Sequence, residues 1–266
     1  TGFLEPSAGK VLINGMNIEE QTLEVQEKIG YLSEQSPLYP EMPVWKYLEY
    51  VTELRNIPIN ERQKAIQDAL VATDLTEKVA EPIQTLSKGY RQRVGVAQAI
   101  VHKPEILILD EPTNGLDPTQ ILAMRQLIKN LSKHSTVILS THIMQEVEAI
   151  CDRVIIILNG RIAVDSALSD LQKNNQINLH VDKSKEELEA ALMKLNGIRT
   201  IQKTGSSNTV NHFTIEAQES ILDLTPKIAK CVIEKGWNLH RIKSEHRTLE
   251  TIFKDVNKET TGGANV

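Results

Sequence analysis

The sequence has few cysteines, few aromatic residues and no long apolar run. Its two cysteines, Cys151 and Cys231, are too few for a disulfide framework, so a reducing compartment is the default expectation. No apolar run approaches the roughly 20 residues that a membrane-spanning helix needs. The formal net charge of -5 gives no electrostatic reason to expect a nucleic-acid partner. With 266 residues, 40% hydrophobic and 24% charged, the chain has an ordinary globular composition, enough for one large or two smaller domains.

A run of four apolar residues, Ile106–Leu109, leads directly into two carboxylates, Asp110 and Glu111. Such a short run is typical of a strand buried on both faces of a parallel sheet, and open α/β sheets bind ligands beyond their C-terminal strand ends. There Asp110 would be placed to hold Mg²⁺, and Glu111 to orient or deprotonate a water molecule. By itself, the same pattern is equally well an acidic turn after a core strand.

The residues after the two carboxylates predict a turn, a helix and a second strand. Gly115 permits a tight turn, and Asp117 followed by proline is typical of a helix N-cap and first turn. Thr136–Leu139 is expected to form a buried strand that leads to His142. His142 would then lie at the same sheet edge as the carboxylates, where it could contact a phosphate, although a lone histidine is more often structural or solvated.

Upstream, a short strand at Lys10–Ile13 followed by an Asn-Gly turn and a strand at Ile29–Leu32 precede a helical region, in which Asn60 is a candidate N-cap. Ser87 and Gly89 come just before a helix of small residues. The unpaired N–H groups and positive dipole end of such a helix fit a phosphate. As a bare pattern, Ser-x-Gly before a helix is more often only a cap.

The C-terminal part predicts a separate α+β domain. A hairpin at 153–164 is followed by a polar break at Lys173–Gln176, which we take as the domain boundary. Residues 177–256 then follow the order β-α-β-β-α-β, the ferredoxin-like pattern, with a last helix over Leu249–Val256. Residues 257–266 are expected to be a disordered tail. This domain shows no catalytic constellation.

The order of these motifs resembles the ATP-binding subunit of ABC transporters over roughly residues 1–170. Five segments carry the resemblance: the Q-loop glutamine Gln35, the signature motif Leu86–Tyr90, the Walker B segment Ile106–Glu111, the D-loop Asn114–Asp117 and the switch histidine His142. The resemblance implies a P-loop NTPase-like α/β fold with a mostly parallel sheet and a helical subdomain. The second domain resembles that of ABC-2-type exporters, and the signature variant resembles their gliding-motility branch.

The resemblance also implies a mechanism. Paired subunits would bind ATP and Mg²⁺ head to tail at the cytoplasmic face of the membrane and power export through a separate membrane-spanning permease. It assigns Asp110 and Gln35 to Mg²⁺ binding, Gln35 also to the attacking water, and Glu111 to the role of general base. His142 would contact the γ-phosphate, Ser87 and Gly89 would contact the ATP of the partner subunit, and Asp117 would belong to the D-loop. Alternatives are a soluble ABC-type ATPase without a membrane partner and a non-hydrolysing nucleotide-binding module.

Two features depart from the family pattern. The signature is usually Leu-Ser-Gly-Gly-Gln, whereas here Lys88 and Tyr90 replace a glycine and the glutamine. The phosphate-binding loop G-x-x-x-x-G-K-[ST] has no match, because the nearest segment has Leu4 in place of the first glycine and Val11 in place of the Mg²⁺-binding Ser or Thr. We therefore expect a chain that is truncated at its N-terminus, lacks this loop, is inactive by itself, and has an unpaired edge on the Ile106–Leu109 strand.

Half of the ten aromatic residues lie between Tyr31 and Tyr50. Aromatic side chains anchor protein interfaces, so the segment from Gln35 to about Ile57 is expected to dock the membrane-spanning partner. They also fill protein cores, and for any one of them that is the simpler interpretation. The transported substrate is not legible from the sequence.

Overall fold

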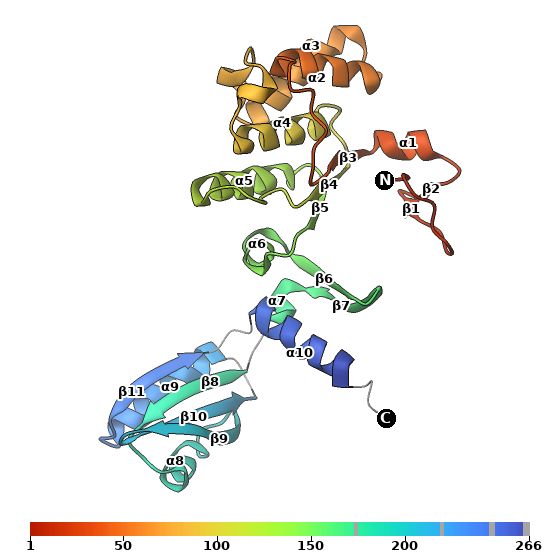
Figure 1. Cartoon of the computed structure of the whole chain (residues 1–266). Coiled ribbons are helices and arrows are strands. Elements are labelled where there is room, and N and C mark those ends of the chain that lie inside the picture. Colours follow the sequence, from red (N-terminus) through yellow and green to blue (C-terminus); the bar gives the residue numbers. More distant parts are fainter. Residues whose placement is uncertain (173–174, 219–220, 245–247, 263–266) are drawn as a thin grey trace. The chain divides into compact units, whose positions relative to one another are not determined.

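The computed structural model describes residues 1–172, 175–218, 221–244 and 248–262. By its internal contacts the chain divides into two compact units, Thr1–Cys151 and Asp152–Val266, which are described separately below (Figure 1).

A parallel sheet of three strands, in the order β3-β4-β5, lies at the centre of the first unit (Figure 1). Its strands are β3 (Ile29–Leu32), β4 (Ile106–Asp110) and β5 (Thr136–Ser140), as the sequence predicts. β4 pairs on both sides, so its backbone groups are satisfied at both edges. The expectation of an unpaired edge on β4 is therefore wrong; within the described residues the edge strands of this sheet are β3 and β5.

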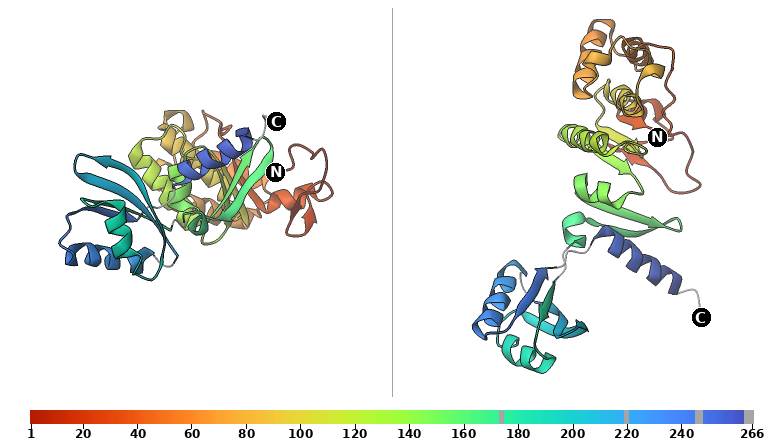
Figure 2. Two further views of the ribbon diagram at one scale, coloured as in Figure 1. Left: turned by 90° about the horizontal axis from the view of Figure 1, so that it is seen from below. Right: turned by 60° about the vertical axis from the view of Figure 1, so that its left-hand side comes forward.

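One face of this sheet carries most of the core. Leu107 and Leu109 are fully buried against helices α4 (Lys88–Ile100) and α5 (Pro118–Leu131). On the other face Ile108 is half-buried, against a smaller cluster around Val25, and Ile138 of β5 is 51% exposed. The prediction that β4 is buried on both faces therefore holds for only one of its faces. The prediction that β5 is a buried strand is wrong, because α4 and α5 cover the same face of the sheet and leave the other face of β5 exposed (Figure 2).

The helical part of the first unit packs around its own core. It contains α2 (Val44–Leu54), α3 (Ile59–Ala72), two single-turn 3₁₀ helices, η1 (Thr76–Lys78) and η2 (Ile83–Thr85), and one face of α4. The predicted N-cap Asn60 is wrong. α3 begins at Ile59 after Pro58, and Asn60 lies in its first turn. A proline is tolerated at a helix start because the missing N–H would have no intrahelical partner there.

The N-terminal segment forms a small hairpin and a short helix. β1 (Leu12–Ile13) and β2 (Met16–Asn17) are joined by an Asn-Gly turn in which both residues have positive φ, as predicted for this turn type. α1 (Thr22–Glu27) then leads into β3, and α6 (Met144–Ile150) closes the first unit.

The second unit contains a ferredoxin-like domain. Its strands are β8 (Gln176–Val181), β9 (Ile198–Ser207), β10 (Val210–Ala217) and β11 (Leu239–Ser244), in the antiparallel order β11-β8-β10-β9. Helices α8 (Lys185–Leu192) and α9 (Ile221–Glu234) share a core with these strands (Figure 1). This arrangement confirms the predicted β-α-β-β-α-β fold.

Three further elements belong to the second unit. The hairpin of β6 (Arg153–Leu158) and β7 (Arg161–Ala167) confirms the predicted turn and is followed by α7 (Leu168–Leu171). The last helix, α10 (Leu249–Gly262), is longer than predicted, because no proline or glycine interrupts it before residue 262. The prediction of a disordered tail is therefore wrong for residues 257–262. Residues 263–266 of the predicted tail lie outside the described residues.

The predicted boundary at Lys173–Gln176 includes residues 173 and 174, which lie outside the described residues. The internal contacts assign the β6–β7 hairpin to the second unit. The domain ranges 1–170 and 177–256 stay a prediction.

Candidate functional site

Glu111 and His142 meet where β4 and β5 end. The Glu111 N–H donates to the Ser140 carbonyl at 2.9 Å, which extends the strand pairing by one residue. The carboxylate oxygen Oε1 accepts from the His142 backbone N–H at 2.9 Å and faces His142 Nδ1 at 2.7 Å. Oε2 accepts from the Thr141 hydroxyl at 3.2 Å. The structure thus brings together two predicted site residues that are 31 positions apart in the sequence.

The backbone turns sharply at Glu111. Its φ of 47° lies in the left-handed region, which is uncommon for a residue with a side chain and occurs often at functional sites. The turn is closed by hydrogen bonds from Asn114 N to Glu111 O at 3.1 Å and from Leu116 N to Thr113 O at 3.2 Å. As a result the Glu111 carboxylate lies at the loop after β5, where its side chain is only 14% exposed, whereas His142 is 72% exposed.

Asp110 ends β4 and is half-buried. Among the residues that the structure describes, its carboxylate has no hydrogen bond or ion pair, so both oxygens are available to an ion. No group of three or more His, Cys, Asp or Glu side chains that could hold a metal occurs in the described part. Asp110 nevertheless fits Mg²⁺, because this ion is usually bound through one or two carboxylates together with substrate phosphates and waters.

Gln35 lies exposed in the loop after β3. Its backbone carbonyl accepts a hydrogen bond from the Ser33 hydroxyl at 3.1 Å. The neighbouring Glu34 carboxylate accepts from the Asn114 side-chain amide at 3.1 Å, so this loop touches the turn after Glu111. No hydrogen bond joins the Gln35 side chain to either predicted catalytic carboxylate within the described residues.

Ser87 and Gly89 lie at the N-terminus of α4, as predicted. Ser87 is the exposed N-cap, and its hydroxyl accepts from the Tyr90 N–H at 3.3 Å. Gly89 is buried, and a Cβ atom there would lie 1.8 Å from the Gln120 side-chain oxygen, so no larger residue fits without a shift. Asp117 caps α5 by accepting from the N–H groups of residues 119 and 120 at 3.0 Å, which confirms the predicted N-cap.

Sequence reasoning missed an ion pair that supports this region. Arg125 of α5 binds Glu146 of α6 through two hydrogen bonds of 2.8 and 2.9 Å, and the Glu146 side chain is 3% exposed. The pair fastens α6, which begins two residues after His142, to the helix that follows the Glu111 turn. Nothing in either local sequence points to the other partner.

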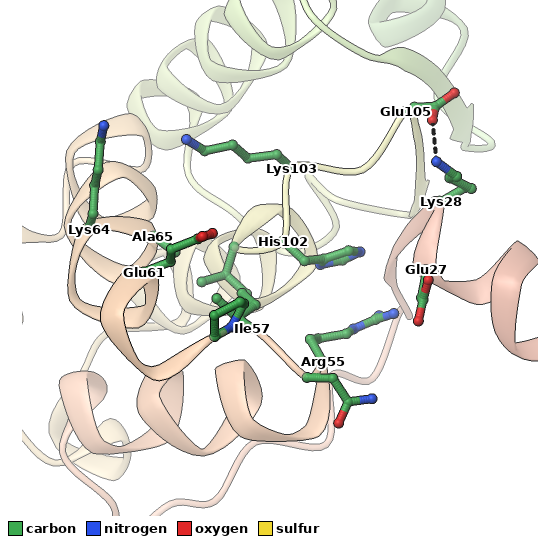
Figure 3. A pocket seen from close by; sticks show the side chains of 13 residues that line it. Glu27, Lys28, Arg55, Ile57, Glu61, Lys64, Ala65, His102, Lys103 and Glu105 are labelled. Carbon is green, nitrogen blue, oxygen red and sulfur yellow. Dashed lines mark ion pairs between the residues drawn. The ribbon is translucent and has the colours of Figure 1, made fainter.

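A separate cleft of about 580 Å³ lies at the opposite ends of the strands (Figure 3). Lys28 precedes β3, Glu105 precedes β4, and they form a 2.8 Å ion pair at its rim. His102 Nε2 donates to the Ile29 carbonyl at 3.1 Å, while its Nδ1 has no hydrogen-bond partner among the described residues. Burial and the nearby Arg55 charge lower the pKa of His102 to about 4, so the ring is neutral. None of the predicted site residues lines this cleft.

Comparisons with known proteins point to one family. The family model described as "ABC transporter" matches residues 1–114. The Bacillus subtilis ABC transporter ATP-binding protein YxlF is 32% identical over 256 residues, covering 96% of this chain and 83% of the relative. The bacitracin transport ATP-binding protein BcrA of Bacillus licheniformis is 30% identical over 264 residues, covering 95% of this chain and 80% of that protein.

Solved structures show the same likeness. An ATP-binding subunit of an ABC transporter superposes with a TM-score of 0.57 at 28% identity, covering 64% of this chain and 72% of that structure. CbiO1 from Clostridium perfringens, part of an ABC transporter complex, gives a TM-score of 0.58 at 26% identity, covering 73% and 76%. The predicted P-loop NTPase-like fold is therefore confirmed.

The chain belongs to the family of ABC transporter ATP-binding proteins. It is an ATPase subunit whose ATP hydrolysis powers transport through a membrane partner, as the sequence predicts. No helix within the described residues has both the length and the apolar composition of a membrane span.

Proposed function

We propose that this chain is the ATP-hydrolysing subunit of an ABC-2-type exporter of the gliding-motility-like branch, acting in pairs at the cytoplasmic face of the inner membrane. The contact between Glu111 and His142 at the ends of β4 and β5 carries the proposal. It places a carboxylate that can accept a proton beside an exposed imidazole, at the sheet edge where α/β proteins bind ligands. Export is supported by the ferredoxin-like second domain, which resembles that of ABC-2 exporters.

In this proposal Glu111 is the general base. Its Oε1 atom is engaged twice by His142, and its Oε2 atom has the single contact to Thr141, which makes Oε2 the better acceptor for a water proton. The left-handed backbone at Glu111 and the three hydrogen bonds to its carboxylate hold this group in one orientation, so little reorganisation accompanies the reaction.

The hydrogen-bond geometry also constrains His142. An ionised carboxylate can only accept, so Nδ1 carries the hydrogen in the contact with Glu111. His142 would therefore contact a γ-phosphate through its other ring nitrogen, Nε2.

The remaining roles follow the family. Asp110 and Gln35 would hold Mg²⁺, which neutralises phosphate charge when bound. Ser87 and Gly89 would face the terminal phosphate of ATP on the partner subunit, where the exposed N-terminus of α4 offers unpaired N–H groups. Asp117 would position the D-loop through its cap on α5.

The segment from Gln35 to about Ile57 is proposed to dock the membrane-spanning subunit. Tyr47 is buried and belongs to the helical core, so for that residue the simpler interpretation holds. Trp45 is 43% exposed and Tyr39 is 48% exposed, which leaves both available to a partner. The end of the segment, Arg55–Ile57, lines the cleft of Figure 3. This cleft offers a concave surface into which a part of the membrane-spanning subunit could insert.

Tests of nucleotide chemistry need a phosphate-binding loop, and residues 1–266 contain no match to that motif. They therefore use the extended chain, defined here as this chain preceded by a phosphate-binding loop. The extended chain should hydrolyse Mg-ATP and co-purify with a multi-span membrane protein encoded beside its gene. Hydrolysis without such a partner would favour the soluble ATPase, and nucleotide binding without hydrolysis would favour the non-hydrolysing module.

A further inference from the structure

Two histidine side chains stack on each other on the ferredoxin-like sheet. His180 of β8 and His212 of β10 are direct partners in the antiparallel pairing of these strands. Their ring centroids lie 3.9 Å apart, and the ring planes differ by 12°. The next residues along the two strands, Leu179 and Phe213, are buried in the core shared with α8 and α9. Because side chains alternate along a strand, both imidazoles lie on the opposite, open face of the sheet, where they are half-buried.

The charges around this pair favour neutral imidazoles. Arg241 of β11 is the register partner of His180 on its other side, and neither histidine forms an ion pair within the described residues. Burial, together with the charges of His212, Arg241 and His240, lowers the pKa of His180. Two imidazolium ions stacked at this distance would also repel each other. Near pH 7 each ring therefore has one unprotonated nitrogen whose lone pair can bind a ligand.

The hydrogen bonds and the neighbouring strand leave ring nitrogens available. Among the residues that the structure describes, the His180 ring has no hydrogen bond. Nε2 of His212 lies 3.0 Å from the Ser207 hydroxyl, and such a contact orients the ring and leaves its other nitrogen to a metal ion. The residue of β9 that pairs with His212 is Gly205, which has no side chain to cover the ring.

We propose that His180 and His212 form a binding site for a divalent transition-metal ion such as Zn²⁺, Ni²⁺ or Cu²⁺, with water in the remaining coordination positions. Imidazole nitrogen suits these ions, whereas Mg²⁺ and Ca²⁺ prefer oxygen ligands. Zn–N distances of about 2.1 Å place two nitrogens on one tetrahedral ion about 3.4 Å apart, so a small tilt of the stacked rings suffices. Two protein ligands, with the cationic Arg241 nearby, bind an exchangeable ion that links β8 to β10.

The test is urea unfolding of residues 1–266 in a Trp45→Phe background, in which Trp237 reports on the second unit because it packs against the core of the ferredoxin-like domain. Unfolding at pH 7 is compared in EDTA and in increasing concentrations of zinc chloride. Zinc that binds only the folded domain should raise the urea midpoint with the logarithm of its concentration above the dissociation constant. Magnesium should leave the midpoint unchanged, and zinc should lose its effect at pH 5, because protons compete for the imidazoles.

His180→Gln and His212→Gln should each weaken zinc binding by more than about tenfold, because even the loss of an outer-shell partner typically costs about 10–100-fold. The matched control is His134→Gln, which removes an exposed histidine of the first unit and should keep the dissociation constant of the parent. Each variant is compared with itself in EDTA, so a general loss of stability does not mimic a loss of binding. A parent that shows no shift at millimolar zinc, or a constant that stays within twofold after either substitution, would overturn the inference.

Discussion

Replacing Arg125 by methionine should lower the stability of the first unit, because Glu146 would stay buried without its charge partner. The Glu146 side chain is 3% exposed and receives both of its described hydrogen bonds from Arg125, at 2.8 and 2.9 Å. Breaking a buried ion pair by removing one partner typically costs about 3–5 kcal/mol. Arg125 is 24% exposed, so water can partly replace it, and the expected loss is near the lower end, about 3 kcal/mol.

The measurement is urea unfolding followed by Trp45 fluorescence in a Trp237→Phe background, because Trp45 lies in α2 and reports on the first unit. Lys103→Met is the matched control: its ion pair with Asp68 is exposed, with side chains 68% and 46% accessible, and should contribute no more than about 1 kcal/mol. Adding Glu146→Leu to Arg125→Met should recover most of the loss, since an apolar replacement of the whole pair is often neutral. An Arg125→Met loss no larger than that of the control would refute the reasoning.

Three further predictions follow from the structure. Trp45→Ala in the extended chain should weaken co-purification with the membrane subunit more than it lowers the melting temperature; the reverse result would make Trp45 a core residue. The folded-state pKa of His102, about 4, lies below its unfolded value near 6.5, so stability should fall as the pH drops from about 6.5 to 4. Urea titrations at pH 7 and pH 4 measure how much the free energy of unfolding falls between these two values. His102→Gln should reduce this fall by at most about 3 kcal/mol, and by less because the ring is partly exposed. An unchanged pH dependence would contradict the assignment. Residues 1–266 by themselves should show no rise in melting temperature with millimolar Mg-ATP, and a saturable rise would reveal a phosphate site other than the family's phosphate-binding loop.

The sequence predicts the strands and their polar ends well, because a short apolar run followed by carboxylates has few alternatives in an α/β protein. The same reasoning places Glu111 and His142 at one sheet edge, and their 2.7 Å contact confirms this placement. The ferredoxin-like order was also predictable, since its helices and strands alternate clearly along the chain.

Other features depend on contacts between distant residues and were not predictable. The lateral order β3-β4-β5 places β4 between two strands, and nothing in the Ile106–Leu109 pattern fixes its neighbours. The pairing of Arg125 with Glu146 joins separate elements, and so does the Gln120 side chain, which fills the space beside Gly89. The left-handed backbone at Glu111 is imposed by the turn that follows it, because local preference alone disfavours it.

The most direct test of the account is the steady-state ATPase rate of the extended chain with Glu111→Gln, measured together with its ATP affinity. Glutamine keeps the size of the side chain but cannot accept a proton from water. Loss of a general base typically costs about 10²–10⁴-fold, so turnover should fall by that factor while ATP binding is retained. A rate within a few-fold of the unaltered extended chain, at equal ATP affinity, would contradict the assignment of Glu111 as the base.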